Sequence, residues 1–394
     1  MFPTVTTTYT LSVVSSLGGS PVTATVTVTV KTFTGKFVYV ANSGGGISGF
    51  SLNDANGVLS ELTNSPFDPT VNALHVSSDP QGKFLFVVNG DGVVNVNTLT
   101  VYAINQATGD LTGAIAYPTG TDPWTAAVDP SGQFVYVRCD GSISAFSLNG
   151  STGALTPLAV PSVTTSGGSG EVLVHPSGKW LFTVGRTSSK LEVFALDPAT
   201  GAITANSSTS LPDVPPINPG DPNLPAGPLS LALSRGGEYL FTKSEGTSGA
   251  VAQECLVYGF HVDVASGGLT ALAPLDTGLA NSVAYHGVSA NPTQSVIYLT
   301  LVNSTNDYVT YALDLTSGLL TPLSGATLDP LSAAESDCFT VSRNGKWGFI
   351  TDYTRSRIAV GAVDPATGIL TKASITFVPV ELFPVSITVV GTVQ

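Results

Sequence analysis

An eight-residue frame recurs seven times along this chain, and it constrains the fold more than any other feature of the sequence. Its clearest copy is residues 196–203, Leu-Asp-Pro-Ala-Thr-Gly-Ala-Ile, in which apolar residues bracket a polar turn that ends at Gly201. The other copies begin at residues 52, 104, 148, 262, 313 and 363 and carry glycine at the same position. Glycine readily takes the positive φ that joins two antiparallel strands in a tight hairpin. The frame therefore predicts a fold built from repeated β-hairpins.

Runs of β-branched and aromatic residues recur in step with the frame and define a unit of about 50 residues. Residues 37–40 and 134–137 both read Phe-Val-Tyr-Val, and a tight turn such as Asp-Pro-Ser-Gly at 129–132 precedes most of these runs. Each unit has room for four strands: one before the turn, one after it, one ending in the frame and one leaving it. Seven such units without helical periodicity predict an all-β, seven-bladed β-propeller of four-stranded antiparallel blades.

The C-terminal residues predict that the ring is closed rather than an open solenoid. The first unit lacks its first strand, whereas residues 383–389, Phe-Pro-Val-Ser-Ile-Thr-Val, match the start of another unit at 122–128. We therefore expect the C-terminal strand to complete the first blade and close the ring, which removes the exposed sheet edges of an open array.

Residues 1–34 differ from the repeats, because they alternate apolar and polar residues around a Leu-Gly-Gly-Ser turn at 17–20. This alternation predicts a β-hairpin. The sequence of its two strands resembles that of the last two strands of a bacterial immunoglobulin-like module. We thus expect two parts, a hairpin over 1–34 and a propeller over 35–394.

Composition excludes several classes of partner. Charged residues make up 10% of the chain and the net charge is −13, so no basic stripe is present to bind nucleic acid or an anionic membrane surface. No run of 18 apolar residues occurs that would span a membrane as a helix. Low charge with abundant Ser and Thr is typical of an exported protein, and we expect an extracellular or cell-surface location, with the natural export signal missing from this chain.

The three cysteines form no Cys-x-x-Cys pair and fall in different repeats, which favours free buried thiols over a disulfide or a metal site; they are Cys139, Cys255 and Cys338. No G-x-S-x-G, H-E-x-x-H or P-loop motif occurs, so no cofactor and no metal is expected. The segment Asn-Gly-Asp-Gly at 89–92 lacks the later ligands of a calcium loop and is interpreted as a turn.

The turn at 129–132, the strand at 134–137 and the frame at 196–203 resemble the lactonase-type seven-bladed propellers. That family holds bacterial 6-phosphogluconolactonase and fungal muconate lactonising enzyme, and the repeats also resemble the YVTN surface-repeat propellers. The resemblance covers about residues 35–391 and implies the fold. Fold alone does not imply activity.

The catalytic residues that the resemblance implies are largely replaced in this chain. In the phosphogluconolactonase relatives an Arg-His pair opens a first strand that ends in His-Pro, whereas here residues 170–176 read Gly-Glu-Val-Leu-Val-His-Pro. Arg186 stands near the position of the family's glutamate, and a later Asp-Arg aligns best with Asp352-Tyr353.

The loops expected at one face of the ring, which we call the mouth, vary in length, whereas the turns on the other face are uniform. The long ones are residues 212–228, 244–254 and 325–337. First strands begin at the mouth, so residues four or five before the turn are expected to face the channel. These candidates are His75, Trp124, Glu171, His286 and Asp337. Arg355 flanks another mouth loop. It is either a ligand contact or a solvated residue of that loop.

Two functions follow as alternatives. In the first, the propeller is an exported or surface-associated scaffold that binds a carbohydrate or a protein at the mouth, with Trp124 and Arg355 as contacts. In the second, it is a lactone hydrolase with a diverged site, in which a carboxylate and an imidazole supply acid-base chemistry. The residues of that site are His75, Glu171, His286 and Asp337.

Overall fold

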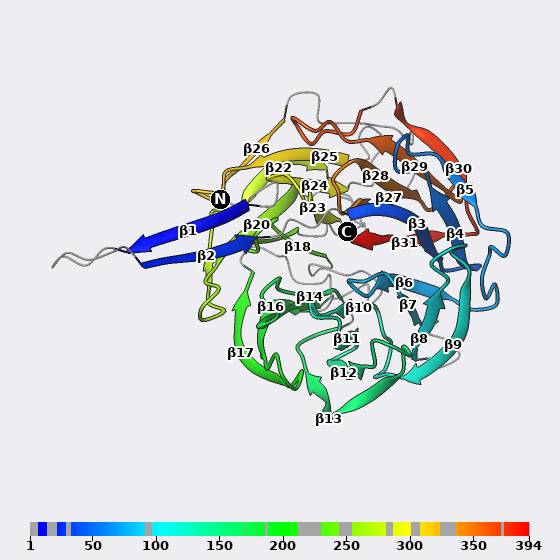
Figure 1. Ribbon diagram of the computed structural model, residues 1–394, viewed down its shortest axis with the longest axis horizontal. Helices are drawn as coiled ribbons and strands as arrows, with labels where there is room; N and C mark the ends of the chain where they lie inside the picture. The colour runs from blue at the N-terminus through cyan, green and yellow to red at the C-terminus, as the bar shows by residue number, and fades with distance from the viewer. Residues whose placement is uncertain are drawn as a thin grey trace.

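The computed structural model of the chain describes residues 7–13, 22–28, 33–90, 97–168, 170–185, 188–211, 230–243, 254–280, 287–300, 308–323, 336–371 and 374–393. Seven antiparallel sheets stand around a central axis as the blades of a propeller, and the described residues contain no helix element (Figure 1). The predicted seven-bladed all-β propeller is confirmed.

The strands of each blade follow one another from the centre of the ring outward. Blades one to four are β31 (Pro384–Val393), β3 (Phe33–Asn42), β4 (Gly46–Leu52), β5 (Leu59–Glu61); β6 (Ala73–Ser78), β7 (Phe84–Asn89), β8 (Thr98–Ile104), β9 (Leu111–Pro118); β10 (Thr125–Val128), β11 (Phe134–Cys139), β12 (Ser142–Leu148), β13 (Leu155–Thr164); and β14 (Val172–Val174), β15 (Trp180–Gly185), β16 (Ser188–Leu196), β17 (Ile203–Ser210).

Blades five to seven repeat this order. They are β18 (Leu231–Leu233), β19 (Tyr239–Lys243), β20 (Glu254–Val262), β21 (Leu269–Ala271) with β22 (Leu275–Ala280); β23 (Val288–Ala290), β24 (Val296–Thr300), β25 (Tyr308–Leu313), β26 (Leu320–Pro322); and β27 (Ser336–Val341), β28 (Trp347–Asp352), β29 (Arg357–Ala362), β30 (Thr376–Pro379). In blade five, β21 and β22 pair with the two ends of β20, so together they form one interrupted outer strand.

The ring is closed by its two ends, as the sequence predicts. The C-terminal β31 pairs antiparallel with β3 from Phe33↔Val393 to Asn42↔Pro384 and forms the innermost strand of blade one. The first blade therefore joins residues from both ends of the propeller, and Figure 1 shows the red β31 beside the blue β3.

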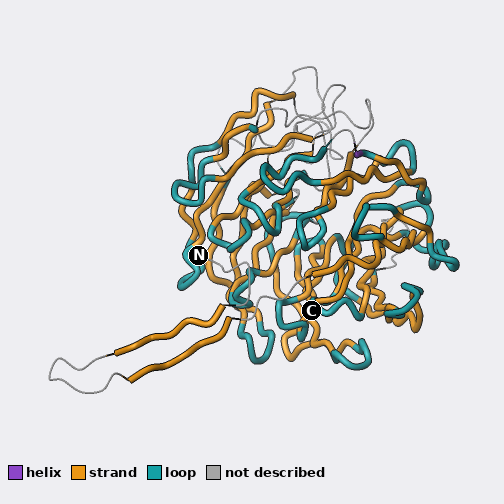
Figure 2. The backbone as a smooth tube through the Cα atoms, turned by 45° about the horizontal axis from the view of Figure 1, so that its top comes forward, coloured by secondary structure: helices purple, strands orange, loops and turns teal. Residues whose placement is uncertain are grey.

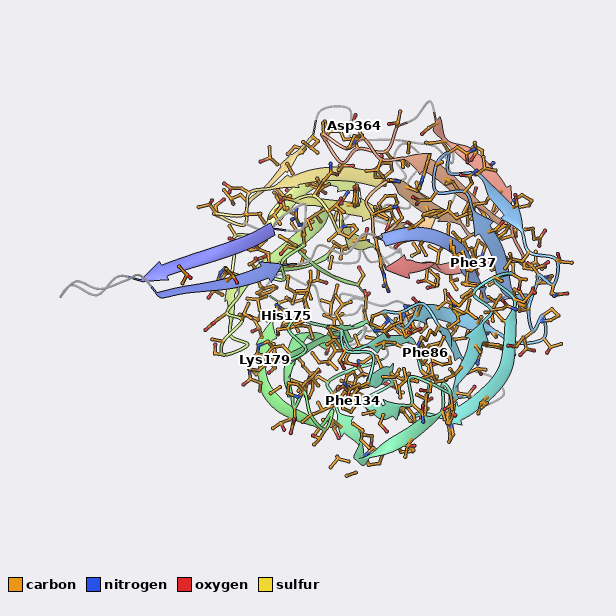
Figure 3. The ribbon with its side chains drawn as sticks, in the orientation of Figure 1. Phe37, Phe86, Phe134, His175, Lys179 and Asp364 are labelled. Carbon is orange, nitrogen blue, oxygen red and sulfur yellow. The ribbon has the colours of Figure 1, made fainter. Side chains whose placement is uncertain are left out.

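Side chains of the second strands fill the spaces between blades. Every residue of β7, β11 and β15 is buried. Alternate residues face opposite neighbours, as the period of a strand requires; Tyr39 and Ala41 of blade one pack against Leu85 and Val87 of blade two. Figure 3 shows such aromatic side chains at Phe37, Phe86 and Phe134, each within its blade.

The frame glycines allow the chain to turn in each hairpin, and they also pack against the preceding blade. All seven have a positive φ, between 70° and 82°. A Cβ on Gly201 would lie 2.3 Å from Phe134 Cδ1, and the Gly201 carbonyl accepts a hydrogen bond from the Tyr136 hydroxyl at 3.0 Å. Each hairpin is therefore seated on the neighbouring blade as well as turning the chain.

The N-terminal hairpin forms a separate two-stranded sheet, β1 (Thr7–Val13) with β2 (Val22–Val28), outside the ring (Figure 2). Its register runs from Thr7↔Val28 to Val13↔Val22.

Candidate functional site

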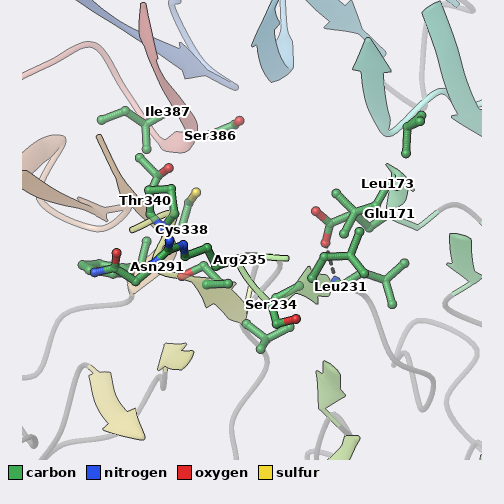
Figure 4. A pocket seen from close by; sticks show the side chains of 18 of the residues that line it. Glu171, Leu173, Leu231, Ser234, Arg235, Asn291, Cys338, Thr340, Ser386 and Ile387 are labelled. Carbon is green, nitrogen blue, oxygen red and sulfur yellow. Dashed lines mark hydrogen bonds between the residues drawn. The ribbon is translucent and has the colours of Figure 1, made fainter. Parts of the chain in front are cut away.

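A cavity of about 450 Å³ occupies the centre of the ring. Its wall comes from the inner strands of six blades and the turns that follow them, including β6, β14, β18, β23, β27 and β31. Figure 4 shows Glu171, Leu173 and Leu231 on one side of this channel and Asn291, Cys338 and Thr340 on the other.

Five hydrogen bonds join the inner strands of blades one to six in succession at the mouth end of the channel. Each acceptor residue lies beside the mouth end of its second strand, and its side chain accepts the backbone N–H of the next inner strand. The acceptors, which we call the interblade ring, are Ser386 Oγ (3.3 Å to Val76 N), His75 Nδ1 (3.4 Å to Ala126 N), Thr125 Oγ1 (3.1 Å to Val172 N), Glu171 Oε2 (2.6 Å to Leu231 N) and Ser230 Oγ (3.0 Å to Val288 N).

Two members of the interblade ring carry more chemistry than the hydrogen bond requires. At Thr125 and Ser230 a hydroxyl is sufficient to accept the N–H of the next blade. Glu171 and His75 place a carboxyl and an imidazole at the equivalent positions, and both residues line the channel. The fold therefore explains a small polar residue at these two places, but not a titratable one.

The Glu171 carboxyl is held in a fixed orientation. Leu231 N–H binds Oε2, and the side chain is only partly exposed, beside the channel-lining residues Leu173 and Leu231 (Figure 4). Burial raises the pKa of Glu171 to about 8 and outweighs the Leu231 hydrogen bond, which lowers it. The group is therefore mainly protonated at neutral pH and ionises near the pH at which many general bases operate.

His75 is oriented by the same device. Its Nδ1 accepts the Ala126 N–H at 3.4 Å, which in the neutral imidazole leaves the proton on Nε2. The ring is partly exposed and lines the channel. The structure thus brings His75 and Glu171 into one cavity, as proposed from the sequence.

The other candidates have different surroundings. His286 lies outside the described residues; Asp337 lies in β27, but its side chain is outside them. Trp124 is partly exposed, its backbone N–H donates to the Arg138 carbonyl at 2.8 Å, and it is not among the residues that line the channel. Arg355 forms an ion pair with Asp352 at 3.6 Å.

The buried cation of blade three has a structural role. Arg138 is fully buried and donates to the Gly167 and Gly168 carbonyls at 2.8 and 2.7 Å, which holds the loop after β13. Burial lowers the pKa of Arg138 to about 10, so the guanidinium is still charged at neutral pH. In blade seven the buried Asp352 similarly binds Arg357 Nε at 2.7 Å and fixes the hairpin after β28.

Sequence reasoning missed Arg235, which lies in the turn after β18 and lines the channel. Its Nη1 donates to the Thr293 carbonyl at 2.8 Å, and Figure 4 shows the side chain directed toward Asn291 and Cys338. A signal was available: an arginine stands here where the turns at 79–83 and 129–133 have proline.

Several expectations fall partly outside the described residues. The mouth loops 212–228 and 325–335 lie wholly outside them, as does 244–253. Cys139 and Cys338 are free and buried, as predicted, whereas the Cys255 side chain is not described. Within the part of the chain that the structure describes, no three His, Cys, Asp or Glu residues gather as a metal site, and no helix is long and apolar enough to cross a membrane.

Known proteins resemble the chain in both sequence and fold. The family model "Lactonase, 7-bladed beta-propeller" matches residues 34–167 and 130–217. The 6-phosphogluconolactonase of Serratia proteamaculans is 28% identical over 202 residues, which are 50% of this chain and 56% of that protein. A probable 6-phosphogluconolactonase of Arthroderma benhamiae is 33% identical over 101 residues, 23% of this chain and 25% of that protein. The chain thus matches about half the length, or less, of these curated relatives.

Solved structures match the whole ring at lower identity. The periplasmic gluconolactonase of Pseudomonas aeruginosa has a TM-score of 0.71 at 20% identity, covering 91% of this chain and 99% of that one. A protein from Lactobacillus plantarum has a TM-score of 0.71 at 16% identity, covering 91% and 100%. At such identities the likeness shows the fold alone, and it agrees with the family match in the first half of the ring. The chain is a seven-bladed β-propeller, and residues 34–217 of it match the lactonase family model.

Proposed function

We propose that this propeller hydrolyses a lactone in its central channel, with Glu171 as general base. The observation that carries the proposal is the titratable pair in the interblade ring. Glu171 and His75 accept the same interblade hydrogen bond that a hydroxyl group accepts at the equivalent positions Thr125 and Ser230. The 6-phosphogluconolactonase relatives support lactone hydrolysis over the binding scaffold, which no comparison favours.

The roles assigned to the two residues follow from the chemistry of their side chains. The Glu171 carboxylate accepts a proton from water as the water oxygen adds to the lactone carbonyl carbon. An Nε2–H on His75 donates to the oxyanion that forms. The ring C–O bond then breaks, the alkoxide receives the proton that Glu171 took from water, and an open-chain hydroxy acid leaves. Atoms and charge balance without a cofactor.

The described wall favours an uncharged sugar lactone as substrate. Phosphate recognition relies on arginine and lysine clusters, whereas Arg235 is the one Arg or Lys side chain among the described residues that line the channel. Arg138 and Arg357 are held by backbone carbonyls and by Asp352. We also propose a location outside the cytoplasm, which the low charge content and the periplasmic relative support.

Two substitutions at one position test the proposal. Glu171→Gln keeps an acceptor for Leu231 N–H but removes the base, and Glu171→Thr installs the residue that the ring uses at Thr125. Both variants should stay folded and lose about 10²-fold or more of kcat/KM toward gluconolactone. Thr125→Ser, which keeps the hydroxyl, is the matched control and should retain turnover. Wild-type kcat/KM in Glu171→Gln would overturn the proposal.

A further inference from the structure

An aromatic pair with one exposed and one partly buried ring lies at the mouth between blades seven and one. The rings of Tyr353 and Phe383 stack with centroids 4.9 Å apart and an interplanar angle of 29°. Phe383 is 40% exposed and the adjacent Leu382 53%. We call these three residues the rim platform.

Three mouth loops hold the rim platform in place. Tyr353 belongs to the hairpin after β28, and Leu382 and Phe383 belong to the crossing from β30 to β31. The hairpin after β3 fixes this crossing, because Ser43 N–H donates to the Phe383 carbonyl at 2.9 Å and Gly44 N–H to the Leu382 carbonyl at 3.1 Å. Backbone hydrogen bonds therefore fix the rim platform in position, and its residues come from blade seven and from the crossing to blade one.

Neither burial nor backbone preference accounts for a phenylalanine at this position. Phe383 has a φ of +61°, in the left-handed region that bulky residues avoid. The equivalent residues before Pro69 and Pro123 are Asp68 and Asp122, at +48° and +46°, and aspartate tolerates this conformation. A strained, exposed aromatic residue indicates a role other than folding.

The exposed apolar surface here also differs from the rest of the ring. Among the described residues nine large apolar side chains are exposed, and only Leu382 and Phe383 are consecutive. Single exposed apolar residues are ordinary on a soluble protein. A contiguous exposed pair, one ring of which stacks on Tyr353, is typical of a ligand contact.

Strand β31 runs from the rim platform to the channel wall. Phe383 precedes Ser386, a member of the interblade ring and of the channel wall, by three residues. At about 3.3 Å per residue in an extended strand, the two are about 10 Å apart. A ligand that touches both the rim platform and the channel wall is therefore longer than one sugar ring.

We propose that the rim platform binds the non-reducing sugar ring of a disaccharide lactone whose lactone ring lies in the channel. This proposal rests on the lactone hydrolysis proposed above. A pyranose ring presents an apolar C–H face, which suits the Tyr353–Phe383 stack, and an edge of hydroxyl groups. Arg355 and Glu381, which lie in the same two loops, provide polar groups for that edge.

The test compares two lactones and two asparagine variants. Wild-type protein should have a higher kcat/KM for cellobionolactone than for gluconolactone. Phe383→Asn, which replaces the ring by a residue suited to positive φ, should raise KM for cellobionolactone about tenfold and leave gluconolactone turnover and thermal stability undiminished. Asp122→Asn, the matched control in blade three, should change neither lactone. Equal wild-type kcat/KM for both lactones, or an equal effect of Phe383→Asn on both, would overturn the platform.

A binding measurement separates this proposal from the hydrolysis on which it rests. Calorimetry with cellobiose and Glu171→Gln should show binding that is lost in the Glu171→Gln, Phe383→Asn double variant. That result supports the platform even if no lactone is hydrolysed. Gluconolactone turnover without any cellobiose binding overturns the platform and leaves the proposed hydrolysis standing.

Discussion

Glu171 occupies a position at which the fold needs only an acceptor. Thr125 and Ser230 meet that need with a hydroxyl. Burying an ionised carboxylate in the channel wall costs more free energy than burying a hydrogen-bonded hydroxyl. This comparison within one molecule is the reason to assign Glu171 to chemistry, because the same backbone environment recurs with and without a titratable side chain.

The residue positions that the sequence predicted well are those tied to the repeat. Counting back four residues from the turns placed His75 and Glu171 at the channel, whereas counting back five gave Trp124, which is not among the residues that line it. This count did not identify Arg235, because Arg235 lies after the first strand, in the turn itself. The hydrogen bonds of the interblade ring were also out of reach, since they join blades and leave no mark on the spacing within one blade.

Gly201 provides a prediction on the repeat itself. Gly201→Ala should destabilise the protein by about 2 kcal/mol or more, because the new Cβ faces both an unfavourable φ and the Phe134 ring at 2.3 Å. Gly178 is the matched control: its φ is +70°, but nothing lies within 4 Å of the Cβ position, so Gly178→Ala should cost only about 1 kcal/mol. Urea unfolding measures both. Equal losses would show that contact with the neighbouring blade does not matter.

At the scale of elements, the four-strand unit was predictable and its interruption was not. The outer strand of blade five is divided into β21 and β22 around Pro274, which lacks the N–H that a ladder needs. Outer strands tolerate such a break because one edge already faces solvent. The division of the chain into a hairpin over 1–34 and a propeller from 35 stays a prediction, as does the immunoglobulin-like origin of β1 and β2.

The closing strand is the element whose loss should matter most. Truncation after residue 379 removes β31 and exposes the inner edge of β3, which is bonded to it from Phe33 to Asn42. We expect a lower unfolding temperature and aggregation by light scattering, because an unpaired strand edge is a template for association. Removal of residues 1–28 deletes the β1–β2 hairpin and should leave both properties unchanged. A monomeric truncated protein with wild-type unfolding would contradict ring closure as a source of stability.

At the scale of the whole molecule, a surface poor in charged residues surrounds a central cavity. The sequence predicted the ring, because seven copies of one frame leave few other folds, but it left a binding scaffold and a hydrolase as alternatives. The mouth loops 212–228, 244–253 and 325–335, on which the scaffold hypothesis depended, lie outside the described residues. The residues that favour hydrolysis lie on the inner strands instead, where the repeat holds them in a fixed geometry.

The pH dependence of lactone hydrolysis tests the central claim most directly. A general base must be ionised, and the pKa of Glu171 is raised to about 8, so kcat/KM of the wild type should rise with pH and level off above about pH 8. Spontaneous lactone hydrolysis also rises with pH and is subtracted using protein-free samples. Glu171→Gln should show a low rate without that inflection, and Thr125→Ser should show the wild-type profile. An inflection near pH 8 that persists in Glu171→Gln, or a wild-type rate that falls through pH 8, would contradict Glu171 as the base.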